Sequence, residues 1–244
     1  MAVVTGAGSG IGRAVALAFA AKGYQLALIG RTRATIEETS ALCDGAEPLV
    51  LTVDVGDESS VDNAFSRVAR AQQRIDVLFN GAGLFGTGAA FDQIASQDWR
   101  RVIDTNLTGS FLCARAAFRQ MKVQSPAGGR IINCGSISAY APRPLTAAYT
   151  ASKHAITGLT RSIALEGRAF SIACGQLDIG NAATGMTDSF TKGTLQADGS
   201  LKPEPMMEAG NVADAALFMA ELPPEANVLF MTVMATAMPF VGRG

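Results

Sequence analysis

The sequence predicts an α/β fold of the Rossmann type, in which a doubly wound, seven-stranded parallel sheet carries helices on both faces. Three observations predict it. Seven short runs rich in β-branched residues or leucine alternate with longer segments of helical period. These runs are apolar at successive positions, as expected of parallel strands that are buried on both faces. A glycine-rich turn follows the first run, where a Rossmann fold binds a dinucleotide.

The predicted elements follow one another along residues 1–244, which we interpret as a single domain. Strands are expected at 2–4, 25–29, 48–53, 76–79, 130–133, 171–177 and 227–233. The first helix is expected to begin near Gly10 and to end at Gly23, because glycine commonly follows a helix. Further helices are expected at 33–42, 58–71, 96–121, 147–167 and 211–221.

The segment at about 185–210 interrupts this alternation. It is rich in Gly, Thr, Lys, Pro and Met and has no regular periodicity. We interpret it as a loop that covers the substrate, since long connections in compact domains are often functional. An irregular surface loop is the alternative.

The composition is that of a globular protein without a polyanionic partner. The net charge is −1, and the chain has no block of basic residues, so nucleic-acid binding is not expected. The most apolar region, 11–29, is interrupted by Arg13, Lys22 and Gln25, which makes it too polar to span a bilayer. The first residues do not resemble a secretory signal, so we expect a cytoplasmic protein with no membrane partner.

The four cysteines are expected to be ordinary thiols. They are scattered through the chain, and no two form a CxxC pair. Without such a pair, the sequence predicts neither a metal site nor a disulfide.

The turn TGAGSGIG at 5–12 predicts a phosphate-binding site. Glycines let the main chain approach a pyrophosphate, and the N-terminus of the following helix presents unpaired N–H groups. The spacing departs from G-x-G-x-x-G, because the third residue after Gly8 is Ile11. A tight strand-to-helix joint is the alternative. The expected cofactor contacts in this turn are Gly6, Ser9, Gly10, Ile11 and Gly12.

The end of the second strand favours NADP(H) over NAD(H), although NAD(H) stays possible. A fold specific for NAD usually places an acidic residue here, against the ribose 2′-hydroxyl. The chain instead has Gly30 followed by Arg31, with Thr32 and Arg33 nearby. A guanidinium can bind a 2′-phosphate through charge-assisted hydrogen bonds. The alternative is that Arg31 is a solvated surface residue.

Tyr149 and Lys153 are candidates for acid-base chemistry. They lie in a predicted helix, where a spacing of four residues puts both side chains on one face. A cation beside a phenol favours the phenolate, which can accept a proton. Taken alone, a Tyr-x-x-x-Lys spacing often arises by chance and usually indicates an amphipathic surface pair.

Ser136 and Asn106 are candidates to act with this pair. Ser136 follows the predicted strand 130–133, at the sheet edge where doubly wound folds bind ligands, and its hydroxyl could donate to a carbonyl oxygen. Ser138 competes for the same role. Asn106 lies inside a predicted helix, where its amide could face the site at a kink or could simply be exposed. The only histidine, His154, is interpreted as structural.

Taken together and in order, these motifs make the chain resemble the short-chain dehydrogenase/reductase family. The motifs are Thr5-Gly-x-x-x-Gly-x-Gly12, Asn80-Gly-Ala-Gly83, Asn106, Ser136 and Tyr149-x-x-x-Lys153. The resemblance covers essentially the whole chain.

The resemblance implies a role for each candidate residue. Tyr149 would be the acid-base, and Lys153 would support its ionisation and hold the nicotinamide ribose. Ser136 would orient the carbonyl, and Asn106 would anchor a water molecule of a proton relay. On the cofactor side, Asp54 and Val55 would contact adenine, the segment with Asn80, Ala82 and Gly83 would line the adenosine ribose, and Arg31 would discriminate between cofactors. The resemblance also implies a homo-oligomer, either a tetramer or a dimer.

The chain departs from the family pattern at three places. Gly81 stands where a second asparagine is usual. After the sixth strand the chain has Ile179-Gly180 in place of Pro-Gly, although Thr184 is retained as a candidate cofactor contact. The C-terminal segment lacks the Asp-Gly-Gly ending of many members.

The sequence therefore predicts an NADP(H)-dependent oxidoreductase that interconverts a carbonyl and a secondary alcohol. The expected partner is a small-molecule carbonyl or alcohol substrate. The walls of the substrate pocket are expected to come from Leu84, Phe85 and the segments 138–143 and 186–207. Arg143 would be either an anion contact in this pocket or a solvated residue. The alternative function is a catalytically silent, redox-sensing module that binds NADP(H).

Overall fold

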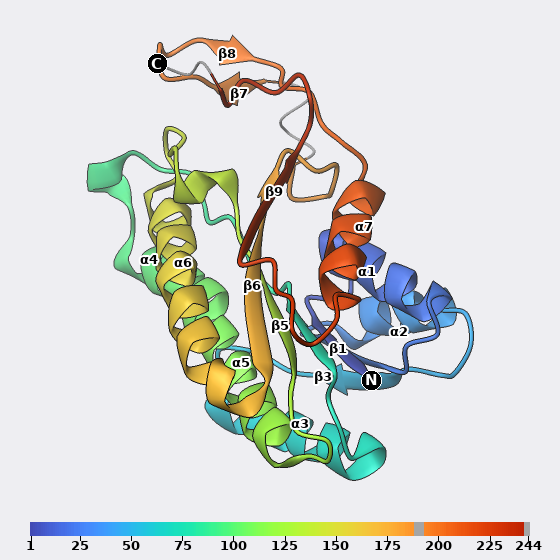
Figure 1. The fold of residues 1–244 in the computed structure, drawn as a ribbon. Coiled ribbons are helices and arrows are strands. Elements are labelled where there is room, and N and C mark those ends of the chain that lie inside the picture. The colour runs from blue at the N-terminus through green and yellow to red at the C-terminus, as the bar shows by residue number, and fades with distance from the viewer. Residues whose placement is uncertain (188–192, 242–244) are drawn as a thin grey trace.

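A central sheet of seven parallel strands forms the middle layer of the computed structural model, which describes residues 1–187 and 193–241 (Figure 1). The strand order is β3-β2-β1-β4-β5-β6-β9. The order reverses between β1 and β4, which is where doubly wound folds bind their ligands. The strands are β1 (Ala2–Thr5), β2 (Leu26–Gly30), β3 (Leu49–Thr52), β4 (Val77–Asn80), β5 (Gly129–Cys134), β6 (Ile172–Gly180) and β9 (Phe230–Met234).

Helices cover both faces of the sheet, which confirms the predicted three-layer fold (Figure 1). One face carries α1 (Gly10–Ala21), α2 (Arg33–Ala41) and α7 (Ala209–Ala220). The other carries α3 (Glu58–Gln72), α4 (Ser96–Ile103), α5 (Gly109–Val123) and α6 (Ala147–Gly167). Short helical turns lie at η1 (Phe91–Gln93), η2 (Asp104–Thr108), η3 (Ile137–Ala139) and η4 (Arg168–Phe170).

Successive residues of the central strands pack into different hydrophobic cores, one on each face of the sheet. In β5, Ile131 belongs to the cluster under α3 and α5, and Ile132 to the cluster under α1 and α7. Leu78 and Phe79 of β4 divide in the same way. All four side chains are fully buried, and each such burial stabilises the fold by roughly 1.5–3 kcal/mol. This is why the strands read as continuous apolar runs.

Local signals account for several helix ends. The chain turns after α1 at Gly23, whose φ of +85° lies in the left-handed region that favours glycine. At the start of α3, the Asp57 carboxylate accepts a hydrogen bond of 2.8 Å from the main-chain N–H of Ser60. The predicted helix 147–167 coincides with α6.

The structure corrects two predicted elements. The single helix expected over 96–121 is divided into α4 and α5 by a π-helical turn at Asp104–Thr108. The sixth strand continues to Gly180, three residues beyond its predicted end. Its continuation is stabilised by polar contacts of Asp178, made with residues distant in sequence.

The expected loop at 185–210 contains some regular structure. Its described part includes a short hairpin of β7 (Thr194–Leu195) and β8 (Leu201–Lys202). The segment returns to the sheet at Met207, which exchanges main-chain hydrogen bonds with Asn181 and Ala183. No helix within 1–187 and 193–241 is long and apolar enough to cross a membrane.

A buried ion pair ties this segment to the loop before α6. Arg143 Nη2 lies 2.6 Å from Glu204 Oε2, and the two side chains are 6% and 1% exposed. Asn181 donates to the same carboxylate oxygen and accepts from Arg143, both at 2.7 Å. Burial alone would raise the pKa of Glu204, but these hydrogen bonds, one from Gln196 and the charge of Arg143 lower it overall. The ionised pair thus stabilises this part of the fold.

Replacing Glu204 by Gln is expected to reduce the free energy of unfolding by about 3 kcal/mol at neutral pH, because Arg143 would keep a buried charge without its partner. Since the folded pKa of Glu204 is lowered, its contribution is complete above the ordinary glutamate pKa. It is lost as the pH falls through the lower folded pKa. Denaturant unfolding at several pH values measures both effects.

Asp198→Asn is the matched control, because this carboxylate lies on the same segment but is exposed beside Lys202. We expect it to leave the unfolding midpoint almost unchanged. Equal midpoints for Glu204→Gln and the original protein at pH 7 would contradict the role of the buried pair.

Candidate functional site

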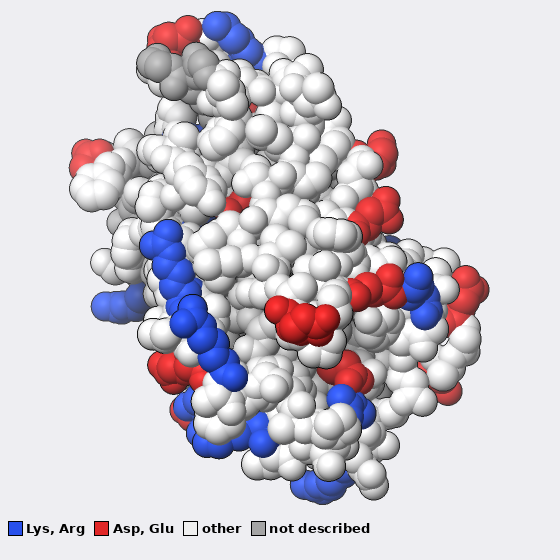
Figure 2. Space-filling model, viewed as in Figure 1, with Lys and Arg blue, Asp and Glu red and all other residues white. Residues whose placement is uncertain are grey.

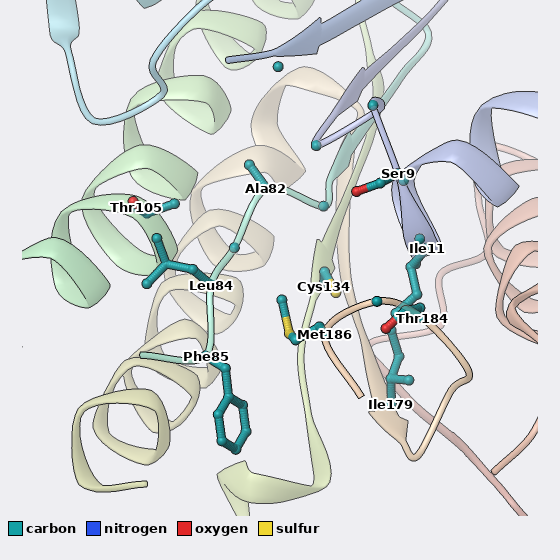
Figure 3. A pocket seen from close by; sticks show the side chains of 18 of the residues that line it. Ser9, Ile11, Ala82, Leu84, Phe85, Thr105, Cys134, Ile179, Thr184 and Met186 are labelled. Carbon is teal, nitrogen blue, oxygen red and sulfur yellow. The ribbon is translucent and has the colours of Figure 1, made fainter. Parts of the chain in front are cut away.

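A cavity of about 420 Å³ opens at the carboxyl edge of the sheet, beside the point where the strand order reverses (Figure 3). The predicted site residues that line it are Gly6, Ser9, Gly10, Ile11, Gly12, Arg31, Val55, Ala82, Gly83, Tyr149, Lys153 and Thr184. Figure 3 shows the cavity bounded on one side by Ser9, Ile11, Ile179 and Thr184 and on the other by Ala82, Leu84, Phe85 and Thr105. One cavity thus brings together residues that are far apart in the sequence, from Gly6 to Thr187.

The glycine turn lies against the segment that follows β4. Gly6 has a φ of +71°, and a Cβ at Gly12 would collide with the carbonyl oxygen of Gly6. Thr5 Oγ1 accepts hydrogen bonds of 3.0 Å from the main-chain N–H groups of Gly81 and Ala82. The first turn of α1 also lines the cavity, and N–H groups at the start of a helix suit an anion.

Arg31 lies at the far end of the same cavity, with Thr32 and Thr35. Its side chain is exposed and makes no hydrogen bond or ion pair with the described residues. The neighbouring Arg33 differs, since its Nε lies 2.7 Å from Glu37 Oε1. Arg31 is thus the guanidinium at this end that is available to a ligand.

Tyr149 and Lys153 meet at the opposite end, in the first turns of α6. Lys153 Nζ lies 5.6 Å from the centre of the Tyr149 ring and donates a hydrogen bond of 2.7 Å to the Cys134 carbonyl oxygen. Burial acts to lower the pKa of Lys153, but Cys134, Tyr149 and Asp178 raise it overall. The ammonium therefore stays charged at neutral pH, and a charged donor beside a phenol suits proton exchange.

Ser136 is buried between two residues that line the cavity, Gly135 and Ile137, but is not itself part of the lining. Its N–H donates to Asp178 Oδ1 at 3.0 Å. Its Oγ accepts from the N–H of Ser138 at 3.1 Å. The competing Ser138 thus contributes a main-chain group that orients Ser136.

Asn106 is only 1% exposed and is not part of the cavity lining, so the alternative that it is simply exposed is wrong. Its amide lies in the π-helical turn and pairs with both main-chain groups of Leu84, at 2.8 and 2.9 Å. It also donates to Ser152 Oγ at 3.1 Å. Asn106 therefore fixes Leu84, which lines the cavity, against α6.

Two of the predicted cofactor contacts lie outside the cavity lining. Asn80 is buried and donates to the Ser110 carbonyl oxygen and to Asn133 Oδ1, at 2.9 and 3.1 Å. Asp54 accepts from the N–H of Gly56 at 3.0 Å and is exposed. In both cases the neighbours line the cavity, namely Gly81 after Asn80 and Val55 after Asp54.

The end of the cavity near Tyr149 is largely apolar. The Phe85 ring lies 4.8 Å from the Tyr149 ring, between centroids, and Ile137, Ile179 and Met186 complete this end. Arg143 is not the anion contact considered from the sequence, because it is buried against Glu204 and Asn181. Within the described residues, no group of three or more His, Cys, Asp or Glu side chains is placed to hold a metal ion.

Sequence reasoning missed Asp178. The residue is completely buried beside Ser136, and its Oδ2 accepts a hydrogen bond of 2.8 Å from Tyr140. A signal was present: Gln176 and Asp178 are polar at alternate positions of a segment that is otherwise largely apolar. Cys134, which lines the cavity, was also missed, and burial raises the pKa of its thiol.

Known proteins of similar sequence agree with the resemblance that the motifs indicate. A family profile described as short chain dehydrogenase matches residues 1–194. A 3beta-hydroxysteroid dehydrogenase of Mediterraneibacter gnavus is 33% identical over 193 residues, covering 76% of this chain and 67% of its own. A 3-oxoacyl-[acyl-carrier-protein] reductase of Synechocystis is 32% identical over 238 residues, covering 95% and 93%.

The fold likeness extends to solved structures. A metagenomic short-chain oxidoreductase in complex with NADP is 26% identical, has a TM-score of 0.80, and is matched over 95% of each chain. Family profile, relatives and fold agree in class. The chain therefore belongs to the short-chain dehydrogenase/reductase family and is a nicotinamide-dependent oxidoreductase.

Proposed function

We propose that this oxidoreductase interconverts a carbonyl compound and a secondary alcohol, uses NADP(H) in preference to NAD(H), and exchanges the proton through Tyr149. The observation that carries the proposal is the cavity itself. It has a glycine turn and an unpaired guanidinium at one end and the Tyr149–Lys153 pair at the other. A bound dinucleotide would contact both ends of this cavity at once.

The shape of the turn supports a bound pyrophosphate. The space that a Cβ of Gly12 would need is taken by the Gly6 carbonyl group, so only glycine lets the main chain pass this close. Gly6, Ser9, Gly10, Ile11 and Gly12 would bind the phosphates, and Val55, Ala82 and Gly83 would line the adenosine side. Asn80 and Asp54 would act through the residues that follow them, Gly81 and Val55, which line the cavity. When bound, the nicotinamide gives or accepts a hydride at C4.

At the other end, the residues of this chain handle the proton and the carbonyl. The phenol of Tyr149 would donate to the carbonyl oxygen in reduction and accept from the alcohol in oxidation. The charged ammonium of Lys153, held on the Cys134 carbonyl, favours the phenolate. Because Ser136 Oγ already accepts from Ser138, its own proton is free to be donated to the substrate oxygen. Asn106 would support the site by fixing Leu84.

The apolar walls near Tyr149 favour an uncharged substrate. Phe85, Ile137, Ile179 and Met186 contribute carbon surface to this end of the cavity, and Arg143 is neutralised by Glu204. The segment after Thr184, whose Met186 lines this end, would cover the substrate. These features are consistent with a hydrophobic ketone or its alcohol.

We also propose a homo-oligomer, either dimer or tetramer, and a cytoplasmic location. Large apolar side chains are exposed on the helices, among them Phe111 on α5, Leu165 on α6 and Phe218 on α7. Exposed apolar surface on several helices suits contacts between copies. Acidic and basic side chains are both scattered over the face that Figure 2 shows.

Gly12→Ala is expected to weaken NADPH binding at least tenfold, because the new methyl group would displace the Gly6 carbonyl and distort the turn. Titration calorimetry measures the dissociation constant. The control is Gly158→Ala on α6, where the added methyl meets nothing within 4 Å. This helix-interior change should leave NADPH binding intact and stabilise the fold by roughly 0.5–1 kcal/mol. If Gly12→Ala bound NADPH as tightly as Gly158→Ala does, the turn would not be the phosphate-binding site.

Arg31→Ala is expected to lower kcat/KM with NADPH by about 10- to 100-fold, since a charge-assisted hydrogen bond contributes about 1.5–3 kcal/mol. The value with NADH should hardly change. Arg33→Ala serves as the control, because Arg33 is already paired with Glu37. Were the original protein to prefer NADH, or Arg31→Ala to affect both cofactors alike, the preference for NADP(H) would be wrong.

Tyr149→Phe is expected to lower turnover by roughly 10²- to 10⁴-fold while cofactor affinity is retained, because only the proton-transferring hydroxyl is removed. Absorbance of the nicotinamide with a panel of ketones measures turnover. Tyr24→Phe is the control, since Tyr24 stacks on Phe19 away from the cavity. If the original protein binds NADPH but reduces no ketone and oxidises no alcohol, the silent redox-sensing module becomes the better proposal.

A further inference from the structure

We infer that Asp178 is a positioning residue for Ser136: its carboxylate is the end point of a row of hydrogen-bonded side chains and fixes the strand-end serine beside the cavity. This inference rests on the proposed function, in which Ser136 binds the carbonyl oxygen. It adds a residue outside the Ser-Tyr-Lys set and outside the cavity lining.

The row begins in the middle of the sheet. Asn80 on β4, Asn133 on β5 and Gln176 on β6 are register partners, so their side chains lie side by side across three neighbouring strands. All three are buried, with at most 3% of the residue exposed. Buried amides are costly unless they are hydrogen-bonded, so a row of this kind requires an ordered set of partners.

The hydrogen bonds of the row point in one direction. Asn80 donates to Asn133, and Asn133 donates to Thr160 of α6, at 3.1 and 2.9 Å. Thr160 donates to Gln176 Oε1 at 3.2 Å, and Gln176 Nε2 donates to Asp178 Oδ1 at 2.7 Å. Each donor faces the next acceptor, so the dipoles are aligned toward the carboxylate and strengthen one another.

Asp178 receives donors on both of its oxygens. Oδ1 accepts from Gln176 and from the main-chain N–H of Ser136, and Oδ2 accepts from the Tyr140 hydroxyl. Such a set of donors suits an ionised carboxylate, which is an acceptor only. The contact with Ser136 joins β6 to the chain just beyond β5, one residue after the last main-chain hydrogen bond between them, from Gly135 to Leu177.

The residue before Ser136 is adapted to this contact. A Cβ at Gly135 would fall on Asp178 Oδ1 and within 2.9 Å of Gln176 Nε2. Glycine at this position therefore lets the carboxylate reach the N–H of Ser136. A side chain at position 135 would occupy the space that the Asp178 carboxylate fills.

Three charged or titratable groups of the described residues lie near the carboxylate. Lys153 of α6 attracts the carboxylate, and the Cys134 thiol lies at the end of β5. Tyr140 comes from the loop before α6, and the charge of Arg161 acts to lower the pKa of this phenol. Burial raises the pKa of Asp178 against the hydrogen bonds and the charge of Lys153. Burial also raises the pKa of Tyr140 to about 12, together with its bond to Asp178, so Tyr140 remains a donor.

The consequence for Ser136 is a fixed orientation. Its N–H is held by Asp178 and its Oγ accepts from Ser138, so both its main chain and its hydroxyl oxygen are constrained. The hydroxyl proton is then the one polar group of Ser136 left to point at a substrate. Weakening the hold of Asp178 should reduce the rate of the chemical step rather than the binding of either ligand.

The test compares Asp178→Asn with the original protein, both saturated with NADPH, on the uncharged ketones cyclohexanone, acetophenone and 2-octanone. We expect kcat to fall about tenfold, with KM changed less than threefold and the NADPH dissociation constant less than twofold. A merely structural role would not separate kcat from both binding constants. Asp76→Asn is the control, because it removes a hydrogen-bonded carboxylate paired with Arg74 outside the cavity lining. It should leave kcat unchanged.

A second measurement does not depend on turnover. In Asp178→Ala with NADPH bound, deuterium uptake by residues 135–140 should be at least tenfold faster, whereas uptake by α4 should not change. Unchanged uptake in 135–140, or a kcat of Asp178→Asn within twofold of the original, would overturn the inference. If the original protein turns over none of the ketones, the proposed function fails, and the exchange rates still decide whether Asp178 holds Ser136.

Discussion

The site depends on one interaction, the hydrogen bond from the buried ammonium of Lys153 to the Cys134 carbonyl oxygen. A charge of this kind is stable inside a protein only when it is paired or hydrogen-bonded. Lys153 meets this requirement by donating to the Cys134 carbonyl at the end of β5, and the acidic groups around it keep it protonated. The same contact fixes the first turns of α6 against the sheet. Tyr149, one turn earlier, is thereby placed beside the Phe85 ring.

The parallel sheet extends this local constraint across the molecule. Because all strands of the main sheet run the same way, the turn after β1, the segment after β4 and the serine after β5 all reach the same edge. Thr5 connects the first two of these by accepting from Gly81 and Ala82, and Asp178 connects β6 to Ser136. Main-chain groups at strand ends, which would otherwise lack partners, are thus used to assemble one cavity.

Sequence reasoning was most successful where the signal is local. The strands, α6 and the glycine turn follow from apolar runs, helical period and glycine spacing, and the structure confirms them. At Asn106 the sequence left a kink and simple exposure as alternatives and did not predict the π-helical turn at Asp104–Thr108, because the partners of Asn106 are Leu84 and Ser152. Aspartate is unfavourable in strands, so the extension of β6 through Asp178 depends on donors that no local pattern reveals. The partners Arg143 and Glu204 are likewise 61 residues apart.

The candidate site shows the same division. The position of Tyr149 beside Lys153 follows from helical spacing, and the availability of Arg31 agrees with the missing acidic residue after β2. By contrast, Asn80, Asp54 and Asn106 lie outside the cavity lining, where their side chains bond other parts of the chain. Which atoms a polar side chain contacts is a property of the tertiary structure.

The most direct test of the central claim is to follow the transferred hydrogen itself. The protein would be supplied with NADPH carrying deuterium at the transferable C4 position and with a ketone that it reduces. The account predicts an alcohol product that is one mass unit heavier, with the deuterium bound to the former carbonyl carbon, because hydride passes directly to carbon while Tyr149 supplies a proton to oxygen. An alcohol product without deuterium from the cofactor would contradict it.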